Sequence, residues 1–157
     1  MFNLSYANFS KAYRHYAELD KGSFFEALGW ADKVDASGYV RNGAVLTSIA
    51  LLSCGVPVSG SQRIEAGPLA GGKVINGANR LADWISLRHN APEILPLDQG
   101  LIDVAYQLFG RRGIVAFMQG TGPQGGLISL VDGRCAGEIC TSAASKHPLE
   151  VRFWPLS

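Results

Sequence analysis

The segment from Arg41 to Gly60 has the layout of a helix built to carry a nucleophile. It reads RNGAVLTSIALLSCGVPVSG and predicts a helix over residues 43–54, which begins after Asn42 and ends at Cys54-Gly55. The N-terminus of a helix lowers the pKa of a thiol in its first turn and so favours the reactive thiolate. Position 44, in that first turn, carries alanine. The segment therefore offers the setting for covalent chemistry without the reactive atom.

Three thiols occur elsewhere, at Cys54, Cys135 and Cys140. Cys54 lies about 15 Å further along the predicted helix than Ala44, so it cannot replace a nucleophile there, and we expect a buried structural thiol. Cys135 and Cys140 flank the short segment CAGEIC and are predicted to form a disulfide in an oxidising compartment. Free thiols and a zinc site are the alternatives, and zinc is the weaker because no second ligand pair lies nearby.

Groups that could act as bases or bind phosphate are scarce. His15 and His89 fall on predicted amphipathic helices and are expected to be partly packed, whereas His147 precedes Pro148 in an expected exposed loop. The Gly-rich segments PLAGG and GPQGG lack the Lys and Ser/Thr of phosphate-binding loops. We therefore predict no cofactor and no metal.

The elements that position these residues change in type along the chain. Apolar residues at helical spacing predict helices over residues 5–19, 23–30, 43–54, 78–90 and 101–110, with a long irregular loop from Val56 to Gly77. β-rich runs follow at 113–120, 126–133 and 150–156. Helices followed by antiparallel strands predict an α+β fold with the helices packed on one face of a small sheet. No linker divides the chain, so residues 1–157 are predicted to form a single amidase-like domain, a name that rests on the resemblance given below.

Composition narrows the class of protein. The chain has 157 residues, of which 47% are hydrophobic and 17% charged, as expected for a globular domain with a substantial core. The formal net charge of +1 gives no electrostatic footprint for nucleic acid. No apolar run approaches the roughly 18 residues of a membrane span, and the start lacks the pattern of a signal peptide. We therefore expect no nucleic-acid partner, no membrane span and no export by the standard signal-peptide route.

Several short blocks occur in a recognisable order. They are Asn42 before the helix, the exit Gly55-Val56-Pro57-Val58, the strand runs RRGIVAFMQG and GLISLVDG, and the turn RCAGEIC. In order and spacing these blocks resemble the fourth family of type VI secretion amidase effectors. The resemblance implies a papain-like, NlpC/P60-like fold and a cysteine peptidase that cuts the stem peptides of peptidoglycan.

The departures from the family pattern fall on the catalytic positions. The resemblance places the nucleophile at Ala44, the histidine at Leu127 and the aspartate at Gly137 or Glu138, while the family's Arg and Trp become Thr47 and Val131. Neither Ala44 nor Leu127 can attack or accept a proton, and loss of such a group costs on the order of a million-fold in turnover. We therefore predict a catalytically inactive pseudo-amidase, with the Cβ atoms of residues 44 and 127 within about 8 Å.

Such a protein would act by binding. The predicted groove is lined by Asn42, Thr47, Ser129 and Glu138, with Gly-rich segments near 67–72 and 120–126. Its predicted partners are a peptidoglycan stem peptide or a target-cell protein, a cognate immunity protein and the secretion apparatus. We expect secretion without a signal peptide to the periplasm of a target cell or outside the cell. The alternatives are a secreted antibacterial toxin with a new activity elsewhere on the scaffold, and a peptidoglycan amidase with a rearranged site.

Overall fold

The computed structural model describes residues 3–120 and 122–157. The chain divides into two compact units. The helical unit comprises residues 7–76, and the sheet unit comprises residues 77–157 together with residues 3–6. No helix in the described ranges is long and apolar enough to cross a membrane. The single domain predicted for residues 1–157 stays a prediction.

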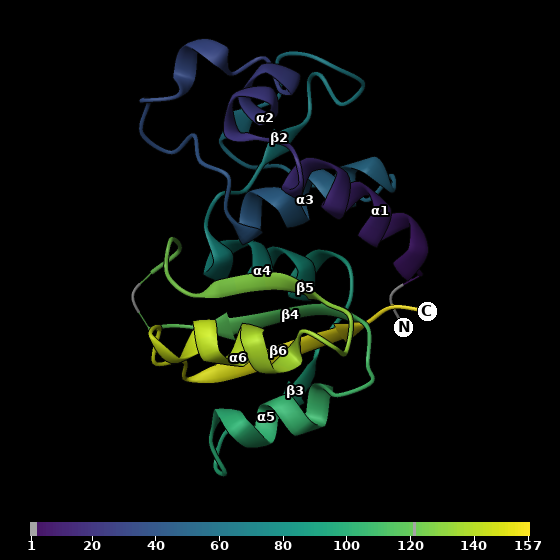
Figure 1. Cartoon of the computed structure of the whole chain (residues 1–157), viewed down its shortest axis with the longest axis vertical. Coiled ribbons are helices and arrows are strands. Elements are labelled where there is room, and N and C mark those ends of the chain that lie inside the picture. Colours follow the sequence, from purple (N-terminus) through teal and green to yellow (C-terminus); the bar gives the residue numbers. More distant parts are fainter. Residues whose placement is uncertain (1–2, 121) are drawn as a thin grey trace. The chain divides into compact units, whose positions relative to one another are not determined.

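The helical unit is built from short helices and one small hairpin (Figure 1). In chain order its elements are α1 (Tyr6–Ala17), α2 (Lys21–Ala27), the 3₁₀ helix η1 (Ala31–Lys33), α3 (Gly43–Ser53), β1 (Gln62–Arg63) and β2 (Lys73–Val74). The two strands pair antiparallel inside the segment predicted as an irregular loop from Val56 to Gly77. That prediction is corrected, because a hairpin with two residues per strand has no alternating apolar pattern to reveal it.

The core of the helical unit is aromatic. Phe24, Phe25 and Trp30 are almost completely buried, and their rings contact one another in tilted or edge-to-face arrangements. The indole N–H of Trp30 donates to the carbonyl oxygen of Arg63 at 2.8 Å. This bond satisfies the one polar group of the buried ring and attaches the β1 strand to the core.

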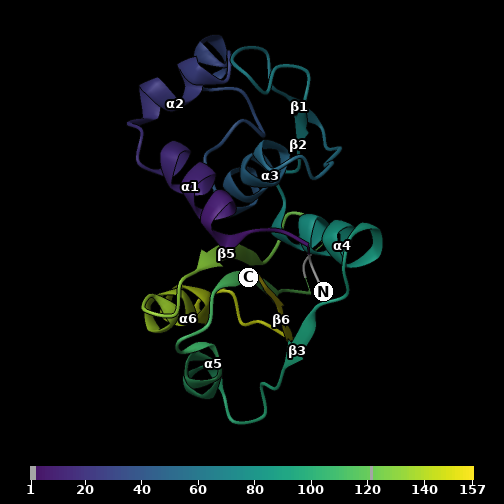
Figure 2. The ribbon, with the colours of Figure 1, turned by 90° about the vertical axis from the view of Figure 1, so that its right-hand side faces the viewer.

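The sheet unit consists of a four-stranded antiparallel sheet and three helices. Its elements in chain order are α4 (Ala78–Arg88), β3 (Glu93–Leu95), α5 (Leu101–Leu108), β4 (Gly113–Met118), β5 (Leu127–Val131), α6 (Ala136–Ala144) and β6 (Glu150–Pro155). The strand order is β3-β6-β4-β5, so the last strand in the sequence lies inside the sheet. Figure 2 shows α4 on one side of this sheet, and α5 and α6 on the other.

Side-chain alternation explains the two faces. Val115 on β4 lies opposite Phe153 on β6 and Ser129 on β5, so these residues project to the same face. Val115 and Phe153 belong to a buried apolar cluster that includes Leu108 of α5 and Ala143 of α6. Burial of this face against α5 and α6 fixes the register of the strands, because a slip of one residue would expose the apolar set.

The predicted α+β class is confirmed, as are the three strands and the five predicted helices to within a few residues at each end. The structure differs in placing helices on both faces of the sheet rather than one (Figure 2). It also contains α6 and β3, which were not predicted. α2 begins at Lys21 rather than Ser23, because the side chain of Asp20 accepts a hydrogen bond from the Ser23 N–H and so caps the helix.

Candidate functional site

The start of α3 is fixed by Asn42. Its Oδ1 accepts a hydrogen bond from the Val45 N–H at 2.9 Å, and its Nδ2 donates to the Asn76 carbonyl at 2.9 Å. Asn42 is therefore the N-cap of α3 and also connects that helix to the end of the helical unit. The side chain predicted to line a binding groove has both its polar ends engaged in holding the fold.

The other two predicted positions on α3 are buried. Ala44 is 2% exposed and Thr47 is 0% exposed. The Thr47 hydroxyl has no hydrogen-bond partner among the described residues. Neighbouring Val45, Leu46 and Ile49 pack into the aromatic core of the helical unit. Thr47 is therefore buried, and its predicted place in the lining of a groove stays a prediction.

Leu127, at the predicted histidine position, opens β5 and faces the α5 and α6 side of the sheet. It lies opposite Phe117 and packs against the apolar cluster of that face. Ser129, two residues on, donates its hydroxyl to the Leu130 carbonyl at 3.1 Å. Ala44 belongs to the helical unit and Leu127 to the sheet unit, so their predicted proximity stays a prediction.

The segment after β5 forms a helix where a disulfide-closed turn was predicted. Cys135 is the N-cap of α6, and Gly137, Glu138 and Cys140 lie within it. Five residues along a helix correspond to about 7.5 Å of axial rise, which exceeds the usual Cα separation in a disulfide. Both thiols are free in the structure, so the disulfide predicted for the oxidised protein is not confirmed. Glu138 is exposed in the first turn of α6.

None of the three thiols has the environment of an activated nucleophile. Burial raises the pKa of Cys54, raises that of Cys135, and raises that of Cys140 to about 11. A thiol with a raised pKa is protonated at neutral pH and therefore a poor nucleophile. No group of three or more His, Cys, Asp and Glu side chains in the described ranges is arranged to hold a metal ion.

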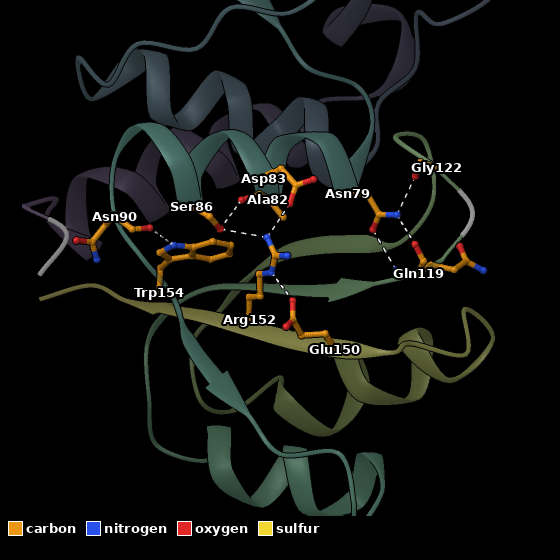
Figure 3. Close-up of polar contacts among 10 residues, drawn as sticks. All are labelled: Asn79, Ala82, Asp83, Ser86, Asn90, Gln119, Gly122, Glu150, Arg152 and Trp154. Carbon is orange, nitrogen blue, oxygen red and sulfur yellow. Dashed lines mark hydrogen bonds and ion pairs between the residues drawn. The ribbon is translucent and has the colours of Figure 1, made fainter.

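Asn79 at the start of α4 organises the loop between β4 and β5, a role that no local sequence pattern reveals. Its Nδ2 donates to the carbonyls of Gln119 and Gly122, and its Oδ1 accepts from the Gln119 N–H at 3.1 Å (Figure 3). Gly126 is required beside it, because a Cβ there would lie 2.5 Å from Asn79 Oδ1. Gly126, which directly precedes Leu127, is thus held against the start of α4.

A second polar cluster connects α4 to β6. The guanidinium of Arg152 forms ion pairs with Asp83 at 2.8 Å and Glu150 at 2.6 Å, and also donates to Ser86 (Figure 3). Burial alone lowers the pKa of Arg152, but the two carboxylates outweigh it and the pKa is raised. All these charges are engaged with one another, which marks the cluster as structural.

Each unit has a pocket away from the predicted site positions on α3 and β5, and Gly137, one candidate for the acidic position, lines the pocket in the sheet unit. One of about 600 Å³, in the sheet unit, lies between α5 and α6 and has mostly apolar walls that include Ile102, Tyr106 and Cys140. The other, of about 320 Å³, lies in the helical unit beside α2 and the 34–41 segment. Its lining includes two cationic side chains, Lys21 and Arg41, whereas that of the first includes one, Arg134.

Several solved structures share the fold of the whole chain. It superposes on the Tae4/Tai4 effector–immunity system of Salmonella typhimurium with a TM-score of 0.71 and 15% identity, covering 99% of both chains. The Tae4–Tai4 complex of Enterobacter cloacae gives 0.71 and 16%, again over 99% of both chains. The effector Tae4 of Enterobacter cloacae gives 0.66 and 18%, over 99% of this chain and 98% of that one. These likenesses establish the shared fold. No curated protein matches the chain.

A family model settles the relationship and corrects the functional prediction. The model described as type VI secretion system (T6SS), amidase effector protein 4 matches residues 39–154. The prediction of an inactive pseudo-amidase that acts by binding is therefore wrong. The alternative prediction of a toxin with an unrelated activity is wrong as well. Both depended on counting catalytic positions along two short motifs, where a small shift in register changes the residue assigned. The chain belongs to the family of type VI secretion amidase effector protein 4.

Proposed function

We propose that the protein is a type VI secreted amidase that cuts peptide bonds of peptidoglycan in the periplasm of a target cell. The observation that carries this proposal is the match of the amidase effector model to residues 39–154, about three quarters of the chain. The likeness to Tae4 structures over 99% of the chain supports it, because the match is not confined to one motif. A papain-like, NlpC/P60-type fold is part of the same proposal.

The proposal includes a cognate immunity protein. The related structures from Salmonella typhimurium and Enterobacter cloacae are effector–immunity complexes. A cell that makes a peptidoglycan amidase needs protection from it, and a protein that covers the effector would supply that protection. We expect the immunity protein to bind this chain as a folded effector.

The positions of the catalytic groups are a separate part of the proposal. We assign the family's nucleophile and histidine positions to Ala44 and Leu127, and its acidic position to Gly137 or Glu138. Hydrolysis through a covalent intermediate needs a nucleophile beside a base. Ala44 and Leu127 supply neither group, so the amidase proposal and this site assignment make opposite predictions for turnover at these two positions, and each has its own experiment.

Turnover is tested by incubating the purified protein with isolated peptidoglycan sacculi and identifying the soluble fragments by mass spectrometry. We expect fragments whose masses show one cleaved amide bond per product. A heat-unfolded sample of the same protein is the control. Fragment release equal to that of the control would contradict the amidase proposal.

Site assignment is tested with the double variant Ala44→Cys, Leu127→His. If these are the family's catalytic positions, a thiol and an imidazole meet there, and the hydrolysis rate rises by at least about tenfold over the natural sequence. Ala31→Cys with Leu149→His introduces the same groups at exposed positions and serves as the matched control. Equal rates for the two variants would overturn the assignment without affecting the turnover result.

A further inference from the structure

The smaller pocket of the helical unit has features of an anion site. Its volume is about 320 Å³, and it is lined by Lys21, Phe25, Val34, Tyr39, Val40 and Arg41. The lining contains two cations and no carboxylate. The remaining walls are aromatic or aliphatic, and Val34 and Val40 are 40% and 42% exposed. The pocket therefore combines positive charge with apolar surface.

Arg41 is held in one position before any ligand arrives. Its Nη1 donates to the carbonyl oxygens of Leu19 and Tyr16, and its guanidinium carbon lies 5.2 Å from the centre of the Phe24 ring. Two acceptors and a stacked ring leave the side chain little freedom, so binding a further partner costs little side-chain entropy. The guanidinium has five N–H donors, of which these contacts use those on Nη1. The donors on Nε and Nη2 can take both oxygens of a carboxylate.

The positive charge of the pocket lacks a counter-ion. Neither Arg41 nor Lys21 takes part in an ion pair within residues 3–120 and 122–157. Asp20, next to Lys21 in sequence, has its two carboxylate oxygens engaged by the N–H and hydroxyl of Ser23, and these bonds lower its pKa. Lys33, outside the lining, lies 5.3 Å from the centre of the Tyr39 ring, and Asp32 and Asp35 flank it in sequence. A half-buried guanidinium with free donors and no acid beside it favours an anionic ligand.

We propose that this pocket binds a free carboxylate of the peptide substrate, with Arg41 as the main donor and Lys21 as a second cation at the rim. The inference rests on the proposed function, in which that substrate is an acidic stem peptide of peptidoglycan. The aliphatic part of the bound residue packs against Val34 and Val40. Arg41 directly precedes Asn42, the cap of α3, so the Cα atoms of Arg41 and residue 44 lie at most about 10 Å apart. The pocket thereby orients the substrate relative to the start of α3.

The test measures binding of one muropeptide, a disaccharide with an acidic tripeptide, by calorimetry at low and high salt. We expect Lys21→Gln to raise Kd by about threefold to tenfold and Arg41→Gln by more than tenfold, with both effects shrinking at high salt. Methyl esterification of the peptide carboxylates should weaken binding to the natural chain and remove the difference between variants. Lys73→Gln and Arg63→Gln remove exposed charges elsewhere in the same unit and should leave Kd unchanged.

Two results would overturn the proposal. One is equal affinity of Lys21→Gln and Lys73→Gln for the free acid, and the other is equal binding of acid and ester by the natural chain. Lys21 is exposed and has no structural hydrogen bond in the described ranges, so its variant remains informative if Arg41→Gln fails to fold. An effect of Lys21→Gln confined to immunity-protein affinity would assign the pocket to a protein interface instead. Muropeptide binding without fragment release would contradict the proposed amidase activity and leave the subsite standing.

Discussion

Trp30 in the helical unit and Trp154 in the sheet unit provide a matched comparison. Both side chains are completely buried, and each indole N–H donates to a backbone carbonyl at 2.8 Å, that of Arg63 for Trp30 and that of Asn90 for Trp154. Their surroundings differ. Trp30 follows α2 and contacts the rings of Phe24, Phe25 and Tyr39, whereas Trp154 lies in β6 and is paired with Ile114 on β4.

The difference shows how each unit holds its backbone. In the sheet unit, β6 is bonded to strands on both sides, so the ladder itself positions the residues around Trp154. In the helical unit, long loops are held by single side chains: Arg41 bonds to two carbonyls, Asn76 to Gly38, and Ser48 to Ile75. The helical unit therefore depends on individual side chains at positions where the sheet unit depends on repeated backbone bonds.

The largest expected effect comes from truncating the two tryptophans. Trp30→Ala and Trp154→Ala should each lower the free energy of unfolding by about 3–5 kcal/mol, because each leaves a large cavity and an unpaired carbonyl. Hydrogen exchange followed by mass spectrometry should show protection lost mainly in the unit that carries the substitution. Equal loss of protection in both units for either variant would contradict the expectation that each tryptophan stabilises mainly its own unit.

The second effect concerns side chains that fix loops. Ser48 donates to the Ile75 carbonyl at 3.2 Å and accepts from the Ile75 N–H at 3.1 Å, while Asn79 plays a similar part for the β4–β5 loop. Ser48→Ala should cost about 1–3 kcal/mol in denaturant unfolding, since the buried backbone groups of Ile75 lose their partner, and Asn79→Ala should cost about 1 kcal/mol, since its partners are less buried. Ser142→Ala, at an exposed position, is the control and should change stability by less than about 0.5 kcal/mol. A cost for Ser48→Ala no larger than the control's would show that loops of the helical unit do not depend on single side chains.

A third effect is the pH dependence that Cys140 gives to the sheet unit. Its folded-state pKa is raised from 9.0 to about 11, so the folded state keeps the proton that the unfolded state releases. The stabilisation is complete below pH about 9 and is lost as pH rises towards 11, by roughly 1–3 kcal/mol in total. Unfolding of the natural chain and of Cys140→Ala should be compared from pH 8 to 11. Parallel curves would show that Cys140 is not the group responsible.

The smallest expected effect is at the surface of the sheet unit. Arg111 and Glu93 are 2.7 Å apart, but their side chains are 37% and 46% exposed. A double-mutant cycle with Arg111→Gln and Glu93→Gln should give a coupling of at most about 1 kcal/mol, which salt reduces. A coupling that is larger and insensitive to salt would show that this edge depends on a charge pair as much as on its strand ladder.

Sequence reasoning succeeded for elements whose pattern is local. Helices such as α3 and α4 have apolar residues at helical spacing over several turns, and β4 and β5 are continuous β-branched and apolar runs. α6 was missed because AGEICTSAA is short and made largely of small residues, and because two nearby cysteines suggested a closed turn. β3 has only three residues and is defined by its pairing with β6, which no local pattern records.

The candidate site was harder to predict than the fold. Asn42 was placed correctly at the start of α3, but its second hydrogen bond goes to Asn76, which is distant in sequence. Asn79 and Arg41 donate mainly to backbone carbonyl oxygens of residues distant in sequence. Every residue has such a carbonyl, so the sequence does not indicate which ones accept. The anion pocket likewise depends on Lys21 and Arg41 converging, which only the folded chain shows.

The internal position of β6 also determines the order of events during synthesis. β6 pairs with both β3 and β4, so until residues 150–155 leave the ribosome, β3 has no partner strand and β4 is bonded on one edge only. The sheet unit must then wait for residues 150–155, whereas residues 7–76 can collapse around their aromatic core earlier. Pairing between strands so far apart in the chain raises the contact order and slows folding. Until β6 is made, β3 and one edge of β4 therefore expose backbone groups that can pair with other chains.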